Sequence, residues 1–242
     1  MSWIIPGLVL FGLLIWGLSR LARYFRHRSA LHQRKLAERI VFIERYRFPI
    51  VLRNRLAEAL STLDAAGLDR VLENLRLFFM LVATRPGVTL GMPSRAVDIA
   101  WHEFILLTRE YTAFCDQAFG GYLHHTPHSG RTFERNAALG ETHQAGIAFA
   151  RSGLGAGVTL ALGAGAGAAL FELDRALAVP GGYQFQDGDF QRFELARLAQ
   201  REASGGTSSG GESSTGSGRT TESEASGDGG GDGGGCGGGC GS

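Results

Sequence analysis

Cysteine is scarce in this chain, and its placement excludes a fold held together by disulfides. Of 242 residues only three are cysteine, and two of them, Cys236 and Cys240, stand in a glycine-rich tail. A disulfide-stapled secreted domain needs several cysteines spread through its folded part. The single Cys115 in the rest of the chain is typical of a protein kept in a reducing compartment.

An excess of one charge and the common catalytic motifs are lacking too. The 24 Lys and Arg residues nearly balance the 23 Asp and Glu residues, and the net charge of +1 does not favour a nucleic-acid partner. Before the glycine-rich tail there is no CxxC, HExxH, P-loop, dinucleotide-binding or nucleophile-elbow motif. The sequence therefore indicates no reaction class, and whether the protein is an enzyme stays open.

What the chain does have is a long apolar N-terminus. Residues 2–18 carry no ionisable side chain, and four arginines follow between positions 20 and 28. A helix of that length spans about 26 Å, slightly short of the roughly 30 Å hydrocarbon core, and it can extend to residue 22 if Arg20 snorkels. A signal peptide carries its positive charge before the apolar run, whereas here the charge comes after it. We therefore predict an uncleaved transmembrane helix over 1–22.

The same arginines predict the orientation of the chain. By the positive-inside rule, the segment after the apolar run lies in the cytoplasm. We expect a single-pass membrane protein with the bulk of the chain cytoplasmic, and the lone Cys115 agrees with that side of the membrane.

Apolar residues recur at helical spacing through the middle of the chain. This pattern favours an all-α fold, with a compact helical domain over 29–203. Ser94 is a good N-cap for one of its helices, which begins at 95. The remainder, 204–242, consists mainly of Gly, Ser, Thr and acidic residues, which bury too little apolar surface to offset the entropy of ordering. We predict a disordered Gly/Ser/Cys tail there.

A second uncharged stretch leaves two interpretations open. Residues 153–171 carry no charge and are long enough for a second membrane span, which would place the tail outside the cell. Six glycines between 153 and 167 each weaken a helix by about 1 kcal/mol relative to alanine. The alternative is a glycine-rich loop that leads into a short buried helix.

Residues suited to metal binding gather in 98–128. Asp98 and His102 are four apart and share one helix face, so the carboxylate can orient the imidazole, as the partners of metal-bound histidines do. Cys115 reaches the same place only if the chain turns near Thr108. The predicted site holds a transition metal such as zinc or iron on His102, Cys115, His124 and His125, with Asp98 behind them as a hydrogen-bond partner.

Ordinary packing explains the same residues without a metal. Trp101, Phe104 and Tyr111 are typical of a helical core. Cys115 would then be a small buried hydrophobe, and His102 would pair with Asp98 or with a backbone carbonyl.

Four segments resemble a bacterial family described as glycine-rich domain-containing, which is distantly similar to plant glycine-rich domain proteins through a D-x-x-W-H pattern. They are "YRFP" (46–49), "MPSRAVDIAWHEFILLTREYTAFC" (92–115), "FGGYLHHTP" (119–127) and "LFELDRALAVPGGYQF" (170–185). The resemblance supplies no activity. Its pattern includes the polar residues of the predicted metal site, which strengthens that hypothesis. This chain lacks the further cysteines that the family often carries near the end of the domain.

Two functions follow as expectations. The first is a membrane-anchored helical accessory or interaction module with a protein partner. The second is a metal-binding or metal-dependent protein that uses the His/Cys cluster in the 98–128 region.

Overall fold

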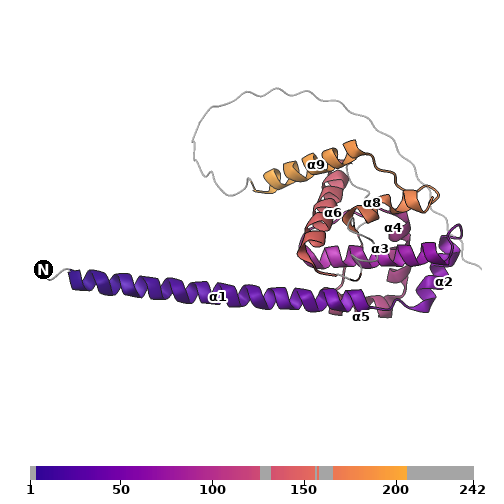
Figure 1. Cartoon of the computed structure of the whole chain (residues 1–242). Helices are drawn as coiled ribbons and strands as arrows, with labels where there is room; N and C mark the ends of the chain where they lie inside the picture. Colours follow the sequence, from indigo (N-terminus) through magenta and orange to yellow (C-terminus); the bar gives the residue numbers. More distant parts are fainter. Residues whose placement is uncertain (1–3, 126–131, 156, 158–165, 206–242) are drawn as a thin grey trace, which may run out of the picture. The chain divides into compact units, whose positions relative to one another are not determined.

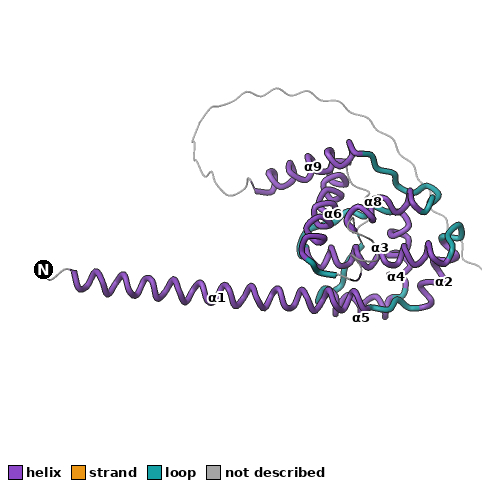
Figure 2. The backbone as a smooth tube through the Cα atoms, in the orientation of Figure 1, coloured by secondary structure: helices purple, strands orange, loops and turns teal. Residues whose placement is uncertain are grey.

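The structure of the chain is a computed structural model that describes residues 4–125, 132–155, 157 and 166–205 (Figure 1). Side chains are described from residue 16 onward, except those of 166 and 205. Every regular element in these ranges is a helix (Figure 2). The helices are α1 (Ile4–Arg45), α2 (Ile50–Ala59), α3 (Ala65–Thr84), α4 (Arg95–Leu106), α5 (Thr108–Ala118), α6 (Thr132–Ser152), α8 (Ala166–Ala176) and α9 (Asp187–Gly205). The prediction of an all-α fold is therefore confirmed for the described residues.

Helix α3 is the centre of the domain. It packs against α1, α2, α4, α6 and α8, and its side chains are buried on every face between Asn74 and Leu81. A helix that is apolar almost all round is stable only when other elements surround it. Its start is fixed by Asp64, whose carboxylate accepts a hydrogen bond from the Gly67 backbone N–H at 2.7 Å.

Arg76 of α3 ties the end of α1 to the domain. Its Nη1 donates to the backbone carbonyls of Ile43, Glu44 and Tyr46 at 2.8, 3.1 and 2.6 Å. The last carbonyls of a helix have no partner within it, so a buried cation there satisfies them and complements the helix dipole. The chain then leaves the helical conformation before Pro49, as residues that precede proline tend to do.

The described side chains of α1 before this contact are mostly exposed. Residues 16–35 are all exposed, and the first buried side chains of the helix are Ile40 and Ile43. The sequence predicts one helix over 1–22 and a separate helical domain that begins at 29, whereas α1 runs without interruption from Ile4 to Arg45. No proline or glycine pair falls between 19 and 45, so nothing there breaks the helix.

In the described part of the chain, no helix is long and apolar enough to cross a membrane. The predicted anchor, 1–22, falls mostly on residues whose side chains lie outside the described set. The same holds for most of the proposed second span, 153–171, and for the predicted tail beyond residue 205.

Candidate functional site

The site is built on α4, whose N-terminus is held by a buried carboxylate from α8. Asp174 is 2% exposed and accepts four hydrogen bonds. Ser94 Oγ donates to it at 2.6 Å, and the backbone N–H groups of Arg95, Ala96 and Tyr183 donate at 2.7, 3.2 and 2.8 Å. One side chain thus fixes the first turn of α4 and also the segment after α8.

The predicted N-cap of α4 is confirmed. Ser94 Oγ accepts a hydrogen bond from the Val97 backbone N–H at 3.2 Å while it donates to Asp174. Because both ends of this hydroxyl are engaged, α4 starts at a defined residue. Asp98 and His102, one and two turns further on, therefore have a defined direction.

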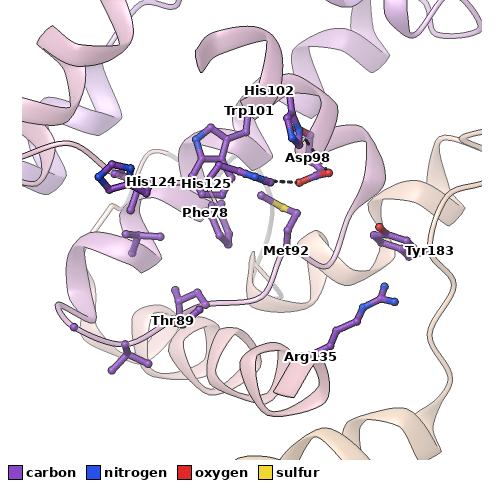
Figure 3. A pocket seen from close by; sticks show the side chains of 15 residues that line it. Phe78, Thr89, Met92, Asp98, Trp101, His102, His124, His125, Arg135 and Tyr183 are labelled. Atoms are coloured by element: carbon purple, nitrogen blue, oxygen red, sulfur yellow. Dashed lines mark hydrogen bonds and ion pairs between the residues drawn. The ribbon is translucent and has the colours of Figure 1, made fainter. Parts of the chain in front are cut away.

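Asp98 and His102 of α4 form a cluster with His125, which follows α5 (Figure 3). The His125 Nε2 atom lies 2.9 Å from Asp98 Oδ1, and the His102 Nδ1 atom lies 3.6 Å from Asp98 Oδ2. The two imidazole rings are 4.2 Å apart between centroids. One donor atom from each of the three residues can be chosen so that all lie within 4.8 Å of one another.

Hydrogen bonding orients the first imidazole. His102 Nδ1 lies 2.8 Å from the Asp98 backbone carbonyl. A carbonyl only accepts, so in the neutral ring Nδ1 carries the proton and Nε2 keeps its lone pair. His102 side-chain exposure is 52%, against 11% for His125, so the free nitrogen of His102 is accessible to solvent and to a ligand.

A chain of hydrogen bonds brings His125 to α4. The Trp101 indole N–H donates to the Tyr111 hydroxyl at 3.0 Å, which in turn donates to the Leu123 carbonyl at 2.6 Å. Burial raises the pKa of Tyr111, which keeps this hydroxyl protonated and able to donate. Two residues beyond Leu123, the His125 ring meets the Trp101 ring edge-on, 4.4 Å between centroids.

Cys115 lies elsewhere. The chain does turn near Thr108, since α4 ends at Leu106 and α5 begins at Thr108. The turn nevertheless directs Cys115 into the hydrophobic core, where it is fully buried and outside the three-residue cluster. Burial raises the pKa of its thiol, which disfavours the thiolate that a metal ligand requires.

His124 also stands apart from the cluster. Its side chain is exposed, and its ring packs 4.9 Å from that of Tyr122. The predicted four-residue ligand set therefore separates into His102 and His125, which meet, and Cys115 and His124, which do not join them. Asp98 stands at the centre of the group and not behind it.

A cavity of about 610 Å³ opens beside the cluster (Figure 3). Its wall consists mainly of apolar side chains from α3, α4 and the loop between them, including Phe78, Leu90 and Met92. Arg135 of α6 and Tyr183 line it as well. In Figure 3 these two lie apart from the histidines, with the cavity between them.

Three residues of this region went unnoticed in the sequence. Asp174 and Tyr183 come from parts of the chain far from the 98–128 region, and Arg135 follows that region by seven residues. A single signal was available for Asp174, which is an acidic residue among apolar neighbours in "LFELDRALAV". Arg135 and Tyr183 lie in segments with no pattern that links them to the histidines.

Comparison with known proteins gives one match. A family described as UCP032817-like matches residues 38–202, a range that contains all three cluster residues and excludes the apolar N-terminus. No curated protein and no solved structure matches the chain. The resemblance to glycine-rich domain proteins is wrong, since the matching family is a different one. Because the match covers more than half of the 242 residues, the chain belongs to the UCP032817-like family.

Proposed function

We propose that this protein binds a divalent transition metal, zinc or iron, through Asp98, His102 and His125. The observation that carries the proposal is the convergence of three donor atoms within 4.8 Å of one another. Ligand atoms lie about 2.0–2.2 Å from such an ion, so two of them in a tetrahedral site are roughly 3.4 Å apart. The Asp98 carboxylate oxygen lies 2.9 Å from His125 Nε2, near that value. On His102 the nitrogen that would bind the ion is Nε2, because Nδ1 faces the Asp98 backbone carbonyl.

The donor set favours a metal with open coordination positions. Two imidazoles and one carboxylate suit zinc and iron(II), and a site with three protein ligands leaves room for water or a small molecule. When bound, such an ion supplies a Lewis acid or a redox centre. This chain's residues would hold it beside a cavity of about 610 Å³, where a small molecule has access to it.

Metal analysis of the purified full chain, in a nonionic detergent, tests the proposal. After dialysis against buffer with trace zinc and iron, we expect about one metal ion per chain by elemental analysis. His102→Ala, His125→Ala and Asp98→Asn should each reduce the content to below about a tenth. Losing even an indirect partner of a metal ligand costs 10–100-fold in affinity, and these variants remove the donors themselves.

Two further variants serve as matched controls. His124→Ala removes a neighbouring imidazole that lines the same cavity but lies outside the cluster. Cys115→Ser removes the predicted thiol ligand, which lies in the core. Both should keep the metal of the unaltered chain. A chain with no stoichiometric metal, or equal loss in the controls, contradicts the proposal.

We also propose that α1 anchors the protein in a membrane, with the domain on the cytoplasmic side. The support is the uncharged run at residues 2–18 followed by arginines, together with the exposure of every described side chain of α1 up to residue 35. A helix that contacts its own domain only near its end leaves its first part available to lipid.

An interaction module is the second candidate. Leu195 and Leu198 are 67% and 44% exposed, and three residues apart on α9 they share one face of the helix. Together they leave apolar surface that a protein partner could cover. If this is the function, His102→Ala changes stability only, and the chain contains no metal before or after the change.

A further inference from the structure

Arg135 is a cation that faces the same cavity. It lies in the first turns of α6, is half-buried, and its guanidinium packs over the Tyr183 ring at 5.0 Å. Within the described ranges of the chain, no carboxylate lies within salt-bridge distance of it. Arg197 and Arg201 of α9, by contrast, both pair with Glu141.

The space between Arg135 and the cluster is lined by apolar side chains. Phe78 and Val82 of α3, Leu90 and Met92 of the following loop, and Leu123 contribute to its wall. A volume of about 610 Å³ is within the 300–1,000 Å³ range of pockets that enclose small organic molecules. The cavity therefore has a cationic side, an apolar middle and a side with metal-binding donors.

We propose that this cavity binds a small organic acid. Its carboxylate pairs with Arg135, its apolar body lies against Phe78 and Met92, and its other end reaches Asp98, His102 and His125. The part of this inference that concerns the metal rests on the proposed function. The carboxylate contact does not, since it requires Arg135 and the cavity alone.

The geometry of Arg135 suits a carboxylate. When a guanidinium stacks on an aromatic ring, its N–H groups point outward in its own plane and remain free to donate. Two such donors match the two oxygens of a carboxylate in a bidentate pair, which is stronger and more directional than a single hydrogen bond. The backbone N–H of Tyr183 donates to Asp174, which fixes the backbone of the residue on which Arg135 stacks.

The test compares two probes with the same apolar body and different end groups, an anionic carboxylate and a neutral hydroxyl. Binding of 3-phenylpropionate and of 3-phenylpropan-1-ol to the full chain in nonionic detergent is measured by titration calorimetry. We expect the carboxylate to bind at least about tenfold more tightly than the alcohol, since hydrogen bonds to charged groups are worth about 1.5–3 kcal/mol. Arg135→Gln should abolish this difference.

Two variants control for folding and for general charge. Arg135→Lys keeps the cation and should retain part of the preference for the carboxylate. Arg151→Gln removes an exposed arginine from the far end of the same helix and should leave both probes unaffected. No preference for the carboxylate in the unaltered chain, or an equal preference in Arg135→Gln, overturns the inference.

Failure of this inference and failure of the proposed function are distinguishable. Asp98→Asn separates the two proposals, because it removes a metal ligand and leaves Arg135 in place. If the chain holds no metal yet prefers the carboxylate through Arg135, the acid site stands and the metal proposal falls. If the chain holds its metal and shows no Arg135-dependent preference, the acid site falls alone.

Discussion

At the scale of single residues, Asp174 has the largest predicted effect on stability. Its carboxylate receives hydrogen bonds from Ser94 Oγ and from three backbone N–H groups. Asp174→Asn keeps the shape but replaces one accepting oxygen by an amide that donates, so two buried donors lose their acceptor. Each costs about 1–3 kcal/mol. We expect the free energy of unfolding to fall by about 3 kcal/mol, measured by urea denaturation followed by circular dichroism.

Glu172→Gln is the matched control for Asp174→Asn. Glu172 lies on the same helix and makes an exposed pair with Arg175 at 3.7 Å. Surface pairs of this kind contribute little, so the change should stay within about 0.5 kcal/mol. Similar losses in the two variants would show that the buried network around Asp174 has no special role.

Because of His143, we expect the free energy of unfolding to depend on pH. Burial against Phe171 and Phe190 lowers the pKa of its imidazole below the ordinary value of 6.5, and nearby Glu194 only partly opposes this. The unfolded chain therefore binds the proton at a higher pH than the folded chain does. The stabilising contribution is present above about pH 6.5 and is lost as the pH falls towards the folded-state pKa.

His143→Gln should flatten this dependence. Between about pH 7 and pH 5, the free energy of unfolding should fall less steeply in the variant than in the unaltered chain. His32→Gln, which removes an exposed imidazole from α1, should leave the slope unchanged. The slopes come from urea denaturation at a series of pH values. Equal slopes in all three proteins would contradict the role given to His143.

At the scale of helices, close approach of backbones decides the packing of α6 against α9. A Cβ atom added at Gly140 would lie 2.4 Å from the Phe193 carbonyl oxygen on α9. Alanine in a helix normally stabilises by about 1 kcal/mol relative to glycine. Here we expect Gly140→Ala to destabilise by about 1–3 kcal/mol, because the helices must separate. Thermal unfolding by circular dichroism measures the change.

Gly188→Ala separates this contact from the general preference of helices for alanine. It lies in the first turn of α9, and a Cβ atom there would meet nothing within 4 Å. The substitution should be neutral or slightly stabilising. If Gly140→Ala is also neutral or stabilising, the close α6–α9 approach is not needed for the fold.

The positions of most helices could be predicted from the sequence, because each carries local information. Ser94 marks the start of α4, and Pro49 follows the end of α1. In the segments between these two residues, the spacing of the apolar side chains identifies the buried face of each helix. The continuity of α1 was harder to predict. Its arginines interrupt the apolar pattern near residue 20, yet they do not interrupt the backbone.

The site could be predicted only where it is local. Asp98 and His102 share a helix turn, and their spacing alone predicts that they are close. The arrival of His125 depends on contacts of Trp101 and Tyr111 with the loop at 123, and the direction of Cys115 depends on how α5 meets the core. Such long-range contacts leave no periodic pattern in the sequence. Arg135 is a further case, since only the folded chain brings α6 to this cavity.

At the scale of the whole molecule, the two parts of α1 differ in their contacts. Near its end, Ile40 and Ile43 are buried and Arg76 holds its last carbonyls, so the helix and the domain are connected firmly. Before residue 36 its described side chains are exposed. A membrane that holds the first part of the helix would therefore keep the domain and its cavity within a few helical turns of the lipid surface.

The anchor is tested by a charge placed in the middle of the uncharged run. Leu10→Arg puts a cation at the centre of residues 2–18, which costs about 2.5–3.5 kcal/mol in a membrane helix. We expect the unaltered chain to remain in the membrane fraction after an alkaline wash and the variant to be released in large part. Leu31→Arg adds the same charge to an exposed position of α1 beyond the run and should not release the chain. Equal release of the unaltered chain and of Leu10→Arg by the alkaline wash contradicts the anchor.

A reporter fused after Gly211 tests the second span in the same cells, because one span leaves it in the cytoplasm and two spans place it outside. A reporter active only outside the cytoplasm contradicts the single span.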